Sequence, residues 1–68
     1  VADLVLTEGQ RQAMDYMISG MSDVEIAKKL GVRHPHTIGA RIWRACNRLG
    51  AMNRAQAAVL YVKMRNPQ

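Results

Sequence analysis

The chain has 68 residues, one cysteine, no phenylalanine and a formal net charge of +5 at pH 7. A chain of this length hides only about 60% of the surface that its unfolded form exposes, so it has no room for a buried catalytic cleft and a supporting scaffold. We therefore expect a single domain over residues 1–68 that is not an enzyme and carries no cofactor, although size alone does not exclude a site assembled with a partner.

The first predicted helix spans about residues 8–19. Thr7 and Gln10 have the spacing of a capping box, in which two side chains satisfy two unpaired amides at a helix start. Gly20 would end this helix, because glycine takes the left-handed conformation at little cost. The expected inner face consists of Ala13, Met14, Met17 and Ile18.

The second predicted helix spans about residues 23–30, between a second capping pair, Ser22 with Glu25, and a closing Gly31. The third spans about 35–48 and begins with Pro35, whose missing amide proton costs nothing at a first helical position. The side chains expected to turn inward from the second helix are Val24, Ala27 and either Leu30 or Ile26.

The fourth predicted helix spans about residues 54–65. Asn53 and Gln56 form a third capping pair, and Met52 is placed to form a hydrophobic staple with Ala57. No segment alternates between apolar and polar residues as a strand would. The pattern predicts an all-α fold, a compact four-helix domain in which the second and third helices form a central helix-turn-helix.

Cellular location and metal binding can be addressed from the same residues. Cys46 has no partner for an internal disulfide, which fits a reducing compartment. The chain shows no signal-peptide pattern and no apolar run near the ~20 residues that a membrane span needs, so we expect a cytoplasmic domain that makes no membrane contact. His34, His36 and Cys46 could suggest a metal site or a Cys–His nucleophile. They lack a second cluster with ligand spacing, however, so we expect neither a metal nor catalytic residues.

The charges are divided along the chain. All five acids lie within the first 25 residues beside a single arginine, a net charge of −4, whereas nine basic residues and no acid follow, a net charge of +9. This division indicates a surface that binds a polyanion, with a merely solvated basic surface as the alternative. Arginine outnumbers lysine in the basic part, and arginine is favoured in phosphate recognition.

The third helix has two distinct faces. Ile38, Ile42, Ala45 and Leu49 share one apolar stripe that should face the core. The opposite side has the side chains suited to base edges, since arginine pairs with guanine and asparagine with adenine, and small residues permit a close approach. The predicted DNA base contacts are Gly39, Ala40, Trp43, Arg44 and Asn47.

Some of these residues have other possible roles. Trp43 could fold back into the core, Asn47 could be merely solvated, and Arg48 could simply favour the negative end of its helix. Arg41 lies nearer the apolar stripe and is expected to extend toward a phosphate. Lys28 and His36 are further candidates for phosphate contact, with His34 at the helix cap.

Six short motifs follow one another along the chain. They are Leu6-Thr7-Glu8, Gly20-Met21-Ser22, Glu25-Ile26-Ala27-Lys28-Lys29-Leu30, Thr37-Ile38, Arg48-Leu49-Gly50 and Asn53-Arg54-Ala55-Gln56-Ala57. In this order they resemble the DNA-binding domain of LuxR-type (GerE-like) bacterial transcription regulators. The resemblance covers residues 6–60, and the segment 53–57 favours this family over the similar fourth region of sigma factors.

The resemblance implies roles for individual residues. Gly39, Ala40 and Trp43 fall where the family contacts bases, and Thr37, Arg48 and Arg54 fall where it has residues that contact the DNA backbone or support the structure. The full set of predicted backbone contacts is Ser22, Lys28, His36, Thr37, Arg41, Arg48 and Arg54. Three departures from the family pattern concern the target sequence: an additional Arg33 in the turn, Arg41 in place of a frequent histidine, and the apolar pair Gly39-Ala40.

The resemblance also implies a dimer formed through the fourth helix, where Ala58, Val59, Tyr61 and Val62 are available. Alternatively, this helix only seals the monomer core. The leading prediction is a sequence-specific regulator of transcription that binds double-stranded DNA as a homodimer. The alternative is an interaction module that forms a heterodimer with a full-length LuxR-type regulator and blocks it.

Overall fold

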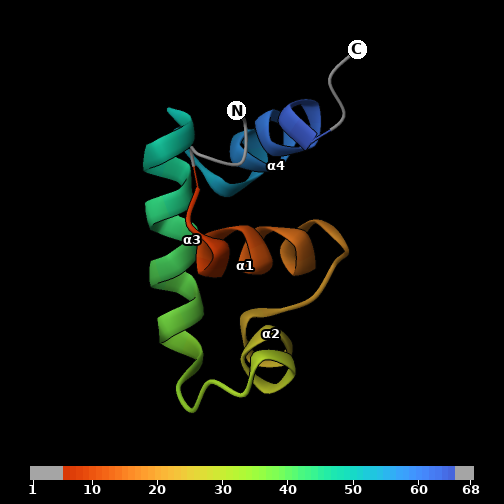
Figure 1. Cartoon of the computed structure of the whole chain (residues 1–68), viewed down its shortest axis with the longest axis vertical. Coiled ribbons are helices and arrows are strands. Elements are labelled where there is room, and N and C mark those ends of the chain that lie inside the picture. Colours follow the sequence, from red (N-terminus) through yellow and green to blue (C-terminus); the bar gives the residue numbers. More distant parts are fainter. Residues whose placement is uncertain (1–5, 66–68) are drawn as a thin grey trace.

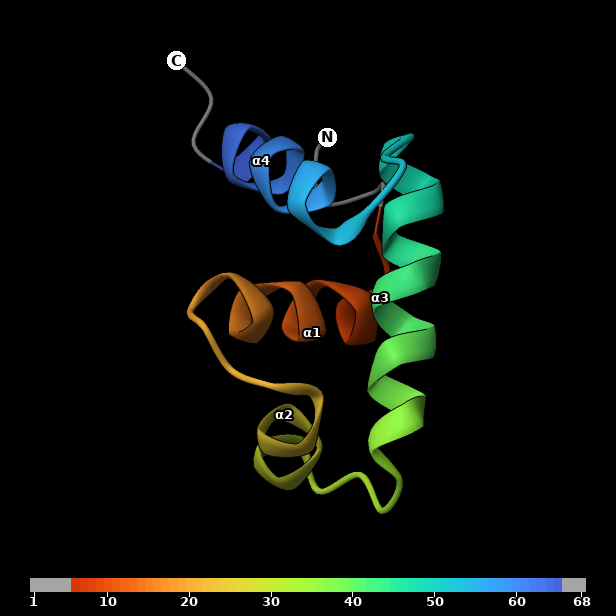
Figure 2. The ribbon, with the colours of Figure 1, turned by 180° about the vertical axis from the view of Figure 1, so that it is seen from behind.

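The computed structural model describes residues 6–65, which form four helices. They are α1 (Glu8–Ile18), α2 (Asp23–Leu30), α3 (Pro35–Leu49) and α4 (Arg54–Arg65), so the predicted all-α fold is confirmed, with helix bounds within one residue of those expected. α1 lies between α2 and α4, and all three pack along the same side of the long α3 (Figures 1 and 2). None of the described helices is long and apolar enough to cross a bilayer.

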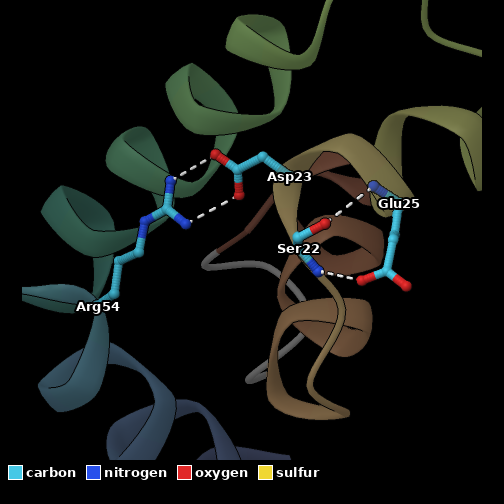
Figure 3. A network of polar contacts seen from close by, with 4 residues as sticks. All are labelled: Ser22, Asp23, Glu25 and Arg54. Atoms are coloured by element: carbon cyan, nitrogen blue, oxygen red, sulfur yellow. Dashed lines mark hydrogen bonds and ion pairs between the residues drawn. The ribbon is translucent and has the colours of Figure 1, made fainter.

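The helix starts are fixed by local hydrogen bonds. In both α1 and α2 the predicted capping box is complete. Thr7 Oγ1 accepts from the Gln10 amide at 3.2 Å, and the Gln10 side chain accepts from the Thr7 amide. Ser22 Oγ accepts from the Glu25 amide at 3.2 Å, and the Glu25 side chain accepts from the Ser22 amide (Figure 3). α3 begins with Pro35 at its first position, and its cap residue, His34, makes no side-chain capping bond. These caps supply partners for amides that a helix start leaves unpaired.

The start of α4 differs from the prediction. Asn53 Oδ1 accepts from the Gln56 amide at 2.8 Å, as expected, but the Gln56 side chain accepts from the Met52 amide at 2.6 Å rather than from that of Asn53. The Met52 side chain is 90% exposed while Ala57 is fully buried, so the predicted staple between them is wrong. The glutamine holds the Met52 backbone in the turn and leaves its side chain in solvent.

The core is built from one stripe of each helix. Its fully buried large side chains are Met14, Ile26, Ile38, Ile42 and Tyr61. Val24, predicted to face inward, is 49% exposed, because residues two apart on a helix lie about 200° apart and Ile26 occupies the core side. The apolar stripe predicted for α3 is confirmed for Ile38, Ile42 and Ala45, whereas Leu49 is only half-buried.

A bidentate ion pair joins the first residues of α2 and α4. Arg54 Nη1 and Nη2 each donate to one oxygen of Asp23, both at 2.9 Å (Figure 3). The hydrogen bonds from Arg54 hold the pKa of Asp23 below its ordinary value, against an opposing effect of burial, and the positive charge of Arg54 adds to the lowering. The pair therefore connects two helices that are separated along the chain by the whole of α3.

We expect Gly31→Ala to lower the free energy of unfolding by about 1–2 kcal/mol, the cost of a left-handed conformation for a residue with a Cβ atom. Gly31 ends α2 at φ 71°, and a Cβ atom there would meet no other atom within 4 Å, so the loss is purely conformational. Urea denaturation monitored by circular dichroism measures it.

Gly9→Ala is the matched control, because Gly9 lies inside α1 and its added Cβ would meet Arg41 only at an ordinary distance of 3.7 Å. Alanine favours the helix by up to about 1 kcal/mol, so this variant should be as stable as the wild type or more so. Equal losses in the two variants would contradict the explanation.

Removal of the ion pair by Asp23→Asn should lower stability at pH 7 by about 0.5–1 kcal/mol, a small value because solvent screens both partly exposed partners. The folded pKa of Asp23 lies below its unfolded value near ~3.9, so the pair stabilises the fold above about pH 4 and this contribution is lost as falling pH protonates the carboxylate. The difference between variant and wild type should therefore shrink as the pH falls below about 4, as measured by thermal unfolding at several pH values.

Glu8→Gln provides the control for this prediction. Glu8 is the first residue of α1 as Asp23 is of α2, so both acids favour the positive end of a helix, but only Asp23 has an arginine partner. The loss at neutral pH should be larger for Asp23→Asn. Equal losses at pH 7 would show that the ion pair contributes nothing beyond the helix end.

Candidate nucleic-acid interface

The outer face of α3 is solvent-exposed along its length. Trp43 is 66% exposed, which confirms that it points outward and rules out its insertion into the core. The other exposed side chains of this face are Ala40, Arg44, Asn47 and Arg48, whereas Gly39 at its edge is half-buried. The segment contains no acid, and within the described residues neither Arg44 nor Arg48 forms an ion pair, so their charges are available to an anionic ligand.

Three of the predicted base contacts, Gly39, Trp43 and Asn47, line a pocket together with residues of the turn that follows α3. The pocket has a volume of about 210 Å³. The complete lining is Gly39, Trp43, Cys46, Asn47, Ala51, Met52, Asn53 and Arg54. The turn between α3 and α4 therefore joins the predicted interface, which sequence reasoning missed because Met52 was assigned to a staple.

Gly39 lies next to the ion pair between Asp23 and Arg54, which its position in the sequence did not predict. A Cβ atom at Gly39 would lie 3.4 Å from Asp23 Oδ2 and 3.6 Å from Arg54 Nη2, so the ion pair between α2 and α4 rests against α3 at this residue. Gly39 therefore lies where three helices meet around one charged pair. The close approach to DNA expected from the small size of Gly39 and Ala40 remains a prediction.

Arg54, a predicted DNA-backbone contact, is tied to Asp23 but remains half-exposed, at 49%. A guanidinium carries five N–H groups, and only two of them donate to the carboxylate. The hydrogen bonds that Arg54 donates to Asp23 raise the pKa of Arg54 above its ordinary value, so it stays charged at every pH of interest. Contact with a phosphate would therefore be made by a guanidinium that is already fixed in orientation.

The other predicted backbone contacts lie on α3 and on α2 with its cap residue. Ser22, Lys28, His36 and Arg48 are exposed, and Thr37 and Arg41 are half-buried. The hydroxyl oxygen of Ser22 already accepts a hydrogen bond from the Glu25 amide. The hydroxyl would therefore contact a phosphate by donating its proton. The Arg41 guanidinium lies close to Gly9 of α1, because a Cβ atom there would be 3.7 Å from its Cζ.

The two histidines at the start of α3 lie against each other. Their ring centroids are 5.3 Å apart with an angle of 24° between the ring planes. Cys46 is a free, buried thiol, 7% exposed, on the inner side of α3. Within residues 6–65, no group of three or more histidine, cysteine, aspartate or glutamate side chains is arranged to hold a metal ion.

A second surface feature lies between α1 and α4. It is a shallow apolar groove of about 590 Å³ lined by Met17, Ile18, Ala58, Val59, Val62 and Lys63. Three of the four residues predicted for a dimer contact line this groove, and Val59 and Val62 are 55% and 41% exposed. The half-buried ends of Met17 and Ile18, which the sequence assigned to the core, contribute its other wall.

Tyr61 is the fourth predicted dimer residue, and its assignment is wrong. It is only 1% exposed, and its hydroxyl donates to Asp15 Oδ1 at 2.6 Å, the same oxygen that accepts from Arg65 at 3.0 Å. Burial and the hydrogen bond with Asp15 raise the pKa of Tyr61 well above its ordinary value. A buried tyrosine needs a partner for its hydroxyl, and Asp15 of α1 supplies it, so Tyr61 seals the monomer core.

Comparison with known proteins agrees with this geometry. The family model of the bacterial regulatory proteins of the luxR family, GerE, matches residues 4–61 of the chain. The chain has no significant match among curated proteins or among solved structures. The match covers all four helix starts and most of α4, and it confirms the resemblance seen in the short motifs. The chain therefore belongs to the LuxR family of bacterial regulatory proteins, as a helix-turn-helix DNA-binding domain of a transcription regulator.

Proposed function

We propose that the domain recognises a specific sequence in duplex DNA by placing α3 in the major groove. The observation that carries this proposal is the exposed face of α3, where arginine, asparagine and tryptophan side chains lie opposite a fully buried stripe. The major groove is about 12 Å wide and admits an α-helix, and its base edges match arginine and asparagine. Base contacts would come from Ala40, Trp43, Arg44 and Asn47, with Gly39 at the edge of the face.

The distribution of charge supports the same orientation. Asp23 and Asp15 are held by Arg54 and Arg65, and the Glu25 side chain accepts the Ser22 amide, so these acids are occupied within the domain. Contacts to phosphates would come from Ser22, Lys28, His36, Thr37, Arg41, Arg48 and Arg54. Such contacts position a protein on DNA without reading sequence and make its affinity fall with salt.

Dimer formation is the second part of the proposal. The groove between α1 and α4 exposes apolar side chains of Val59 and Val62 that no described residue covers. Two copies joined there would place two α3 helices on half-sites about one helical turn, ~34 Å, apart. The same groove supports the alternative function. In that case the domain pairs with a full-length regulator of the same family and blocks that regulator.

Selection from a random duplex library with the purified chain, at near-physiological salt, tests the function directly. We expect an enriched inverted repeat, because a two-fold symmetric dimer imposes its symmetry on the site. An enriched single half-site would remove the dimer and keep DNA recognition. Weak, salt-sensitive binding without enrichment would contradict sequence recognition and favour the interaction module, whose apolar contact should change little with salt.

Two substitutions separate base contact from phosphate contact. Arg44→Ala should weaken binding to the selected site by about 1–3 kcal/mol and relax the preference at one base pair. Lys28→Ala should instead weaken binding to all sequences about equally and lower the salt slope by about one. Both side chains are exposed, so thermal unfolding should be unchanged. Unchanged affinity of Arg44→Ala for the selected site would show that Arg44 does not contact a base.

A further inference from the structure

The two most exposed large apolar side chains among the described residues lie in the same place. Met52 is 90% exposed and Trp43 is 66% exposed, and both line the pocket between α3 and the turn that follows it. Single apolar residues on a surface are ordinary, but two that share a concave site mark a contact surface. Neither side chain is buried in the core, so both are available to a ligand.

The surroundings of the pocket define the chemistry of that ligand. Asn47 and Arg54 also line it, and Arg44 lies on the neighbouring exposed face, so the apolar side chains of Trp43 and Met52 share the pocket with cationic and amide groups. The carboxylate of Asp23 is already paired with Arg54, one of the lining residues. An anionic partner with a small apolar group is therefore favoured over a wholly apolar one.

Duplex DNA presents one apolar group on its major-groove base edges, the C5-methyl group of thymine. From this match we propose that Trp43 and Met52 form a pocket for the thymine C5-methyl group and so determine specificity for thymine at one position of each half-site. The volume of about 210 Å³ is ample for a methyl group and the adjoining edge of the pyrimidine ring. This inference rests on the proposed function, since it requires that α3 enter the major groove.

The placement of the pocket fits this assignment. Gly39, Trp43 and Asn47 follow one another at intervals of four residues, so they form one row along α3. Gly39 has no side chain to fill the row at its near end, and Met52 closes the pocket from the turn. In the proposed complex, a base edge beside Asn47 would lie next to Trp43, the preceding member of this row.

The test uses the best duplex from the library selection, with each thymine replaced in turn by deoxyuridine. This exchange deletes only the methyl group and keeps all base-pair hydrogen bonds. Fluorescence anisotropy at fixed salt should show a loss of about three- to tenfold at one thymine of each half-site, the scale expected for one buried methyl group, and less than twofold at the others. At that position, 5-methylcytosine paired with guanine should bind more tightly than cytosine by a similar factor.

The Trp43→Ala variant should bind the thymine and deoxyuridine duplexes equally, and Met52→Ala should reduce the difference. Val24→Ala is the matched control, because Val24 is an exposed apolar residue on α2 outside the pocket, and this variant should keep the full preference. Thermal unfolding of each variant confirms that the exposed substitutions leave the fold intact.

The outcomes separate the two proposals. A duplex that is bound specifically but tolerates deoxyuridine at every thymine overturns the methyl pocket and leaves the proposed function in place, as does a Trp43→Ala variant that still discriminates thymine from deoxyuridine. A selected half-site that contains only G·C pairs also overturns the pocket alone. Absence of any specific duplex overturns the proposed function and the pocket together.

Discussion

Burial of one stripe of α3 against the other three helices is the interaction on which the rest of this small domain depends. Ile38, Ile42 and Ala45 are fully buried, and α1, α2 and α4 all pack on the side of α3 that carries them (Figure 1). A helix that buries one stripe in this way must present the opposite one to solvent. Residues such as Trp43 and Arg44 are thus exposed by the same packing that gives the domain its core, and the surface proposed to contact DNA is rigid because the core holds it.

The ionic contacts arrange charge around that helix. Asp23 joins α2 to α4 through Arg54, and Asp15 joins α1 to α4 through Arg65 and Tyr61. Each ion pair therefore connects two helices and neutralises one carboxylate. Individually, exposed pairs of this kind contribute little to stability. Their larger effect is on the field of the molecule, since they neutralise acids that would otherwise repel a polyanion and leave arginines on α3 unpaired.

Local features were predictable from the sequence, and contacts between distant residues were not. Helix bounds followed from capping pairs three residues apart, and the buried side of α3 followed from its periodicity, because both depend on neighbouring residues alone. The ion pair between Asp23 and Arg54 joins residues that are 31 positions apart, and no rule of local spacing predicts it. The burial of Tyr61 likewise depends on a carboxylate of α1, although a tyrosine in a chain with only three aromatic residues was a reasonable core candidate.

Only the part of the proposed site that depends on helical periodicity could be predicted from the sequence. The outward residues of α3 came from helical geometry, but the contribution of Met52 depends on how the turn after Gly50 folds back beside α3, which periodicity does not describe. The Gln56 side chain accepts a hydrogen bond from the Met52 amide in that turn, and the exposed Met52 side chain lines the same pocket as Trp43. The surface that we propose for DNA recognition therefore includes residues of the turn as well as residues of α3.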